Sequence, residues 1–168
     1  MKRIWFLSFL MLVSLSFSAC GSDISDNLLP PEERENPGGE DSSDNPENVE
    51  DMEIKMTIGG QVITVTMENN AAARDFISRL PLEITLNDFN NTEKIFYPEP
   101  KLNIEGVGRG CTPVAGDITI YVPWGNVAIF YKGWSQSNSL IKIGHIDGDG
   151  INILSAYSGD VHMKIEKN

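Results

Sequence analysis

The sequence predicts a mainly β domain of about eight short strands with one or two helices, folded as a barrel or a sandwich. Three observations lead to this prediction. Apolar and polar residues alternate in short runs along the last two thirds of the chain, over residues 52–168. Gly, Pro and Asn separate these runs at turn positions. Helices alternate regularly with strands in a parallel sheet, but the two segments with helical spacing in this sequence do not.

The chain divides into three segments of different composition. Residues 1–20 contain two bases and no acid, residues 21–51 contain eleven acids and one base, and residues 52–168 contain thirteen acids and ten bases. The net charge of −11 therefore comes mainly from the middle segment. The last segment, of about 117 residues, is long enough for one small domain with its own core. Its nearly balanced charge argues against nucleic acid as a partner.

The first twenty residues have the features of an export signal. Lys2 and Arg3 precede an apolar run that is shorter than the roughly 20 residues of a membrane-spanning helix. The small residues before Cys20 resemble a bacterial lipobox, which implies cleavage before Cys20 and lipidation of its thiol. The alternatives are an ordinary signal cut near Ala19 and an uncleaved anchor. We expect a lipid anchor in the bacterial cell envelope, with the outer membrane favoured, on its periplasmic or surface face.

Residues 21–51 read as a disordered acidic linker. The segment is rich in Pro, Gly, Ser and Asn, and its acids repel one another, so it cannot form a core. We interpret it as a spacer, and a surface-export signal is the alternative. If Cys20 is acylated, Cys111 has no partner within the chain, and the domain over residues 52–168 must be stable without a disulfide.

The domain begins with a predicted hairpin and a helix. Residues 52–67 alternate between apolar and polar on both sides of Gly59-Gly60, which is a two-residue hairpin turn. Asn69 or Asn70 can cap a helix over residues 71–80, because apolar residues there share one face and a proline follows.

Two more strands and an irregular segment follow. Alternation predicts strands over residues 82–86 and 93–97, joined by a loop through residues 88–91. Residues 98–115 contain several glycines and prolines and one arginine, Arg109. No Lys-Ser or Lys-Thr pair follows these glycines, so we interpret the segment as a flexible loop rather than a phosphate-binding loop.

The strongest strand signal is a hairpin over residues 117–122 and 127–132. It contains few charged residues, so both of its faces should be covered. The remaining predicted elements are a strand over residues 140–146, a turn over 147–150, one or two helical turns over 151–157 and a closing strand over 160–166.

Several motifs in this order resemble the bacterial cyclophilin-like domain family. They are Ala73-Arg74-Asp75-Phe76, Leu80-Pro81-Leu82, Glu93-Lys94-Ile95, Gly116-Asp117-Ile118, and Pro123-Trp124-Gly125-Asn126 with Ala128, Phe130 and Tyr131. The resemblance covers residues 52–168 and implies a closed eight-stranded cyclophilin-like β-barrel with one or two capping helices. It implies no particular chemistry, because most of the family has no assigned function.

The sequence departs from prolyl isomerases of the cyclophilin type. These enzymes place an Arg on a strand, followed by a Phe-Met-x-Gln stretch, and the Arg hydrogen-bonds the twisted peptide. Here the corresponding strand offers Lys94, and Arg109 lies in a glycine-rich loop instead. No isomerase residue can therefore be carried over to this chain.

Other constellations favour structural roles. Cys111 has no supporting spacing to His145 or His162 for a thiol nucleophile. Asp147-Gly-Asp149-Gly lacks the remaining ligands of a calcium loop, and no zinc spacing is present. We therefore expect no metal and no cofactor.

The remaining candidate site is aromatic. Aromatic residues concentrate around the central strands, and those forced outward from the barrel can line a groove for a ligand. We predict ligand contacts at Tyr97, Arg109, Trp124, Phe130 and His145.

The sequence thus favours a membrane-tethered, monomeric cyclophilin-like module that binds a peptide or small ligand, rather than an enzyme. One alternative is a divergent peptidyl-prolyl cis-trans isomerase. A second is a structural cell-envelope lipoprotein without a ligand.

Overall fold

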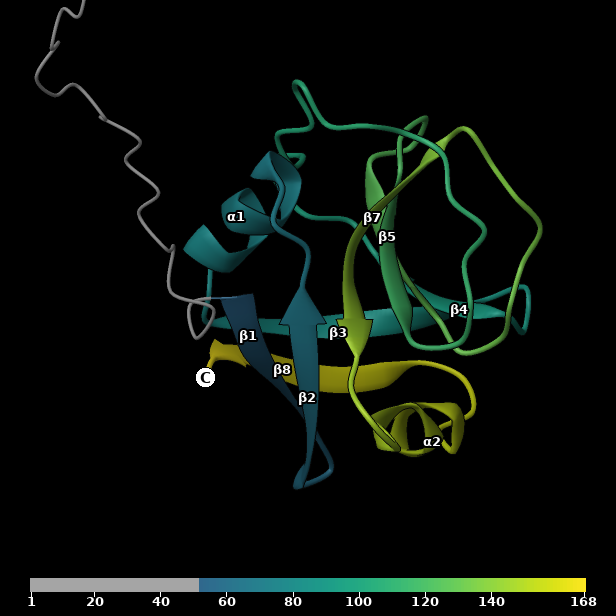
Figure 1. Ribbon diagram of the computed structural model, residues 1–168. Helices are drawn as coiled ribbons and strands as arrows, with labels where there is room; N and C mark the ends of the chain where they lie inside the picture. Colours follow the sequence, from purple (N-terminus) through teal and green to yellow (C-terminus); the bar gives the residue numbers. More distant parts are fainter. Residues whose placement is uncertain (1–51) are drawn as a thin grey trace, which may run out of the picture. The chain divides into compact units, whose positions relative to one another are not determined.

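The computed structural model describes residues 52–168. The predicted export signal, the lipidation site Cys20 and the acidic linker lie outside the described residues. The elements of the described chain are β1 (Glu53–Ile58), β2 (Gln61–Met67), α1 (Ala71–Ser78), β3 (Leu82–Phe89), β4 (Glu93–Phe96), β5 (Asp117–Tyr121), β6 (Asn126–Phe130), β7 (Leu140–Ile146), α2 (Gly150–Ser155) and β8 (Val161–Lys167) (Figure 1).

The strands close into an antiparallel barrel in the order β1-β2-β7-β5-β6-β4-β3-β8. The last strand returns to the first, since Met56 of β1 pairs with Ile165 of β8. Every strand of the barrel therefore has a neighbour on both sides, and the barrel leaves no open sheet edge. This arrangement confirms the predicted mainly β fold class and the closed eight-stranded barrel.

Alternating residues of the strands fill the barrel. Ile54, Met56 and Ile58 of β1 are at most 1% exposed, and the intervening residues point outward. Met163 and Ile165 of β8 are completely buried in the same core. The period of two that predicted the strands therefore also separates the core from the surface.

The two helices lie at opposite ends of the barrel, α1 above it and α2 below it in Figure 1. Asn70 caps α1, because its Oδ1 accepts a hydrogen bond of 3.0 Å from the backbone N–H of Ala73. Phe76 of α1 is buried against Phe96 of β4, with ring centroids 6.2 Å apart. Within residues 52–168 neither helix is long and apolar enough to cross a membrane.

Strand β3 is longer than predicted. The sequence suggested a strand over residues 82–86 and a loop through 88–91, but β3 continues to Phe89. The turn is formed by Asn90 and Asn91, which have φ of 54° and 52°, and the N–H of Thr92 donates to the Phe89 carbonyl at 3.1 Å. Asn accepts this left-handed conformation more readily than most residues, so an Asn-Asn pair ends a strand as a tight turn. The other boundaries agree with prediction to within two residues.

A second apolar cluster lies on the outer face of the barrel wall. It contains Ile95, Ala128, Phe130 and Leu140, which are at most 6% exposed. The segments between β4 and β5 and between β6 and β7 cover this face, and a backbone bridge at Cys111 and Ser137 joins them. The prediction that both faces of the central hairpin are covered is confirmed.

Candidate functional site

A pocket opens on this outer face of the barrel wall, and residues of β3, β4, β6, β5 and β7 line it. Cross-strand pairing places its residues in two rows, since paired residues point to the same face of a sheet. One row is Phe89, Glu93 and Phe130 on β3, β4 and β6. The other is Leu140, Tyr121 and Asn126 on β7, β5 and β6.

The small residue Ala128 separates these two rows on β6. The pocket encloses about 230 Å³. This is less than the roughly 300–1,000 Å³ of sites for drug-sized ligands, so it suits a small molecule or one side chain.

Trp124 closes one end of the pocket. Its ring meets the rings of Phe89 and Tyr121 edge to face, with centroid distances of 5.7 and 5.3 Å. The turn that carries it is fixed by the N–H of Gly125, which donates to the Tyr121 carbonyl at 2.8 Å. Gly125 has φ of +75°, and a Cβ there would lie 2.6 Å from the Lys101 side chain. The Trp124 side chain is therefore fixed next to Phe89 of one row and Tyr121 of the other, although it is 48% exposed.

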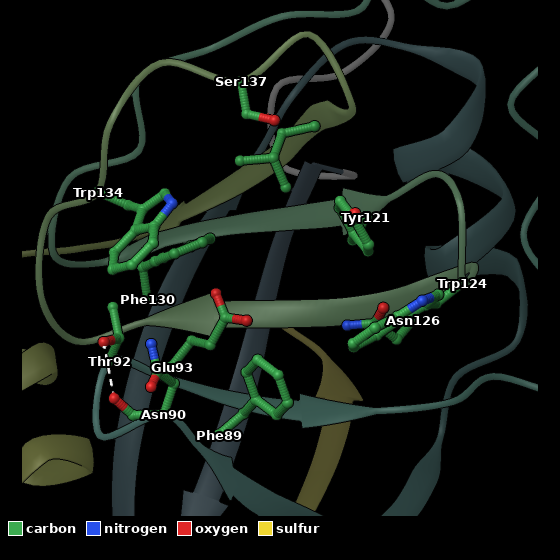
Figure 2. Close-up of a pocket in the computed structure, with 11 residues that line it drawn as sticks. Phe89, Asn90, Thr92, Glu93, Tyr121, Trp124, Asn126, Phe130, Trp134 and Ser137 are labelled. Atoms are coloured by element: carbon green, nitrogen blue, oxygen red, sulfur yellow. Dashed lines mark hydrogen bonds between the residues drawn. The ribbon is translucent and has the colours of Figure 1, made fainter. Parts of the chain in front are cut away.

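Trp134 lines the other end, on the segment between β6 and β7. Its backbone N–H donates to the Pro113 carbonyl at 2.9 Å, and its side chain is half exposed. Figure 2 shows its indole beside Phe130. Aromatic rings therefore line the pocket from one end to the other.

Two polar groups in the pocket lack partners within the described residues. The Glu93 carboxylate has no hydrogen bond or ion pair there, and burial raises its pKa above the usual 4.5. Oδ1 of Asn126, a residue only 1% exposed, has no hydrogen-bond partner either. The neighbouring Thr92 hydroxyl is already engaged, since it donates to the Asn90 carbonyl at 3.1 Å. A polar group without a protein partner in such a site calls for an explanation, and a bound ligand, ion or water can provide one.

Two of the five residues predicted to contact a ligand line this pocket. Trp124 and Phe130 do so, with Phe130 almost fully buried as part of the wall. Tyr97, Arg109 and His145 are not among its lining residues. Tyr97 lies exposed after the end of β4, and Arg109 lies exposed between β4 and β5. Ligand contacts at all five positions remain predictions.

His145 belongs to a separate ionic cluster. Its Nδ1 lies 2.7 Å from Oδ1 of Asp117, which the Lys142 ammonium also contacts at 2.8 Å. Burial of Asp117 raises its pKa, but the hydrogen bonds from Lys142, the Val114 N–H and His145 outweigh this effect and lower it. Burial and the charge of Asp117 raise the pKa of the Cys111 thiol, which is unfavourable for a nucleophile.

Lys94 is turned away from the pocket. It follows Glu93 on β4 and therefore points to the opposite face, where it is fully buried. Its ammonium donates to the Asp88 carboxylate at 2.6 Å and to the carbonyls of Tyr157 and Gly159 at 2.8 and 2.6 Å. Lys94, which stands on the strand where prolyl isomerases have their Arg, is therefore a structural cation. Within residues 52–168 no three His, Cys, Asp or Glu side chains group as metal ligands.

A comparison with protein-family models matches residues 56–166 to the cyclophilin-like family. The chain belongs to the cyclophilin-like family. The match spans nearly all of the barrel, from β1 to β8, and confirms the resemblance described above. No curated protein matches the chain.

The fold of this cyclophilin-like protein also occurs in a solved structure from an archaeon. The solution structure of a hypothetical protein from Archaeoglobus fulgidus superposes with a TM-score of 0.55. The two are 15% identical, and the alignment covers 73% of this chain and 98% of the archaeal one. At this level of identity the likeness shows the fold alone.

Sequence reasoning missed three important lining residues, Phe89, Glu93 and Asn126. Phe89 was assigned to a loop, and the two polar residues lie in strands where alternation reports only which face they occupy. The Asn90-Asn91 pair, a turn signal, would have extended β3 to include Phe89.

Proposed function

We propose that the protein is a membrane-tethered cyclophilin-like binding module, which holds a small ligand or one side chain of a peptide in the aromatic pocket. One observation carries this proposal: a pocket that combines aromatic walls with two polar groups lacking protein partners, the Glu93 carboxylate and Oδ1 of Asn126. Binding sites commonly consist of an apolar lining with a few polar groups that fix the ligand's orientation. The tether rests on the lipobox-like Cys20.

The pocket gives less support to the isomerase alternative. The described residues that line it include an acid, Glu93, and no Lys, Arg or His. Lys94, the nearest cation in the sequence, is buried on the opposite face of β4. No feature of the described residues favours this reaction over binding.

The binding proposal can be tested with 2-phenylethanol and N-acetyl-phenylalanine methylamide as probes. Saturation-transfer NMR on the full-length chain in a non-ionic detergent should detect both. Trp134→Ala and Trp124→Ala should each weaken binding about tenfold, because a loss of about 1.4 kcal/mol is typical of a removed aromatic contact. Both side chains are about half exposed, at 50% and 48%, so neither change should disrupt the fold.

Tyr97→Ala is the matched comparison, because it sets the ligand contact predicted from the sequence at Tyr97 against the pocket. Tyr97 is as exposed as the two tryptophans, at 52%, but does not line the pocket. If the pocket is the binding site, this change should leave the affinity for both probes unchanged. The pocket assignment is wrong if Tyr97→Ala weakens binding as much as Trp134→Ala does, or if the two tryptophan variants bind like the wild type.

A further inference from the structure

The unpaired carboxylate of Glu93 identifies the chemistry of the ligand, provided that the pocket is a binding site as proposed above. Figure 2 shows this carboxylate pointing into the middle of the pocket, with Phe130 and Trp134 on one side and Phe89 on the other. Its two strand partners, Phe89 and Phe130, are both aromatic. An acid in this position loses hydration without gaining a protein partner.

None of the nearby charged or titratable groups neutralises Glu93. Lys94 is bound to Asp88 on the opposite face of the wall. The Lys132 ammonium donates to the Asn91 carbonyl at 2.7 Å, and it makes no ion pair with Glu93. Tyr131 is an acid rather than a base, and its hydroxyl bonds to Asp88. No cation among the described residues therefore compensates the negative charge of Glu93, and a ligand could do so.

The walls favour the same sign of charge. The faces of aromatic rings carry negative potential, and a cation held against them gains about 0.5–2 kcal/mol, with the larger values in desolvated sites. Phe89, Phe130 and Trp134 surround the carboxylate, and Trp124 and Tyr121 continue the lining. An anion would meet both this potential and the charge of Glu93.

Asn126 adds a second polar contact at a fixed place. It lies on the same strand as Phe130, in the other row of the pocket, and is only 1% exposed. Figure 2 shows its amide directed along the pocket toward the Glu93 side. An amide provides both a donor and an acceptor, so it can orient a hydroxyl, amide or amine on the ligand.

We propose that the pocket binds an organic ammonium group, with Glu93 as its counter-ion, the aromatic rings as its walls and Asn126 as an orienting hydrogen-bond partner. The ammonium belongs either to a free amine with an apolar body or to a lysine side chain of a peptide. The small pocket volume accommodates either source.

The pH dependence follows from the sign of the charge. Glu93 must be ionised to attract the cation, and burial raises its pKa above 4.5. Cation affinity is therefore present above that raised pKa and falls as the pH drops through it. The same shift means that the folded domain tolerates a neutral residue at position 93 better than the charged one at neutral pH.

The experiment compares three probes of similar shape and different charge on the full-length chain in a non-ionic detergent. The probes are 2-phenylethylammonium and neutral 2-phenylethanol, titrated by ligand-observed NMR at about pH 7.5 and about pH 4, and anionic 3-phenylpropanoate, titrated at about pH 7.5 alone because its carboxyl group is largely protonated at about pH 4. N-acetyl-lysine methylamide forms a fourth arm. If it binds more tightly than the free amine, the ammonium comes from a peptide, and the reverse order indicates a small amine.

The wild type should bind the cation about tenfold more tightly than the neutral probe at neutral pH, and the anion most weakly. At low pH, where the Glu93 carboxyl group is largely protonated, the preference for the cation should shrink to about twofold or less. Glu93→Gln should prefer the cation by about twofold or less at both pH values. Its midpoint of urea unfolding at neutral pH should not fall below that of the wild type. Asn126→Ser should weaken all three probes.

The outcomes separate the two proposals. If all three probes bind the wild type equally well, or if Glu93→Gln keeps the preference for the cation, the ammonium assignment is wrong and the binding module stands. If no probe binds in any arm, the pocket is not the binding site and both proposals fail. A loss of stability in Glu93→Gln would identify Glu93 as a structural residue instead.

Discussion

Lys94 shows how a single buried charge can hold several parts of the barrel together. Its ammonium connects β4 to Asp88 near the end of β3 and to two carbonyls, Tyr157 and Gly159, between α2 and β8. Asp88 in turn accepts a hydrogen bond from the Tyr131 hydroxyl, and burial together with this bond raises the pKa of Tyr131 to about 12. Removing the cation leaves a partly buried acid and two carbonyls without their donor.

Lys94→Met should therefore lower the free energy of unfolding by about 3 kcal/mol or more, as is typical when one partner of a buried ion pair is removed. Burial raises the pKa of Asp88, but the bonds from Lys94 and Tyr131 lower it overall. The stabilisation that Asp88 gives to the folded protein is therefore present above the pKa of Asp88 in the unfolded chain. It disappears as the pH falls through the pKa of Asp88 in the folded protein, which lies below 3.8. Urea titrations at neutral and at acid pH measure both effects.

Lys132→Met is the control for this prediction. Lys132 lies over the same Tyr131 ring, at 5.6 Å against 5.5 Å for Lys94, but it is exposed. It should change the unfolding free energy by less than about 1 kcal/mol. Equal effects of the two substitutions would mean that Lys94 is not a structural cation.

Helix α1 depends on one residue at its start. The Oδ1 of Asn70 caps the helix at the Ala73 N–H, and its Nδ2 donates to the Lys142 carbonyl of β7 at 3.0 Å. Asn70→Ala removes both bonds and should destabilise the protein by about 1–2 kcal/mol. Asn69→Ala, at the exposed neighbouring position, should cost less than about 0.5 kcal/mol. Thermal unfolding of both variants tests this assignment, and the reverse order of effects would contradict it.

The elements could be predicted from the sequence more completely than the site. Alternation with a period of two reports the two faces of a strand, so the hairpins and the helix emerged close to their observed bounds. The pocket depends instead on which strands become neighbours, and Phe130 reaches Glu93 only because β6 pairs with β4. Glu93 and Asn126 carried no local signal, because an isolated polar residue in a strand is usually solvated. Trp124 could be proposed because it stands in a turn, where a large ring has little chance of burial.

A lipid anchor on Cys20, which we propose from the sequence, would hold the whole protein at a membrane. Cys20→Ala removes the thiol that the acyl chains would modify, so it should abolish the mass increase of these chains. Because the buried acyl chains provide the anchoring, the protein should also shift from the membrane fraction to the soluble fraction. Cys111→Ala is the matched control, because Cys111 lies within the barrel domain and is free. Fractionation and intact mass spectrometry of both variants provide the measurement. A Cys20→Ala variant that stays in the membrane with unchanged mass would refute the lipid anchor.

The order of strands around the barrel also determines how the domain can be attached to a support. In the closed ring β6, which carries Phe130 and Asn126, lies four strands from β1 in either direction. The chain enters the barrel at β1 and ends after β8, which pairs with β1, and the Asn168 N–H donates to the Glu53 carbonyl at 3.3 Å. A fusion partner, affinity tag or sensor surface joined at either end of the barrel therefore attaches on the side opposite the pocket and leaves its mouth open.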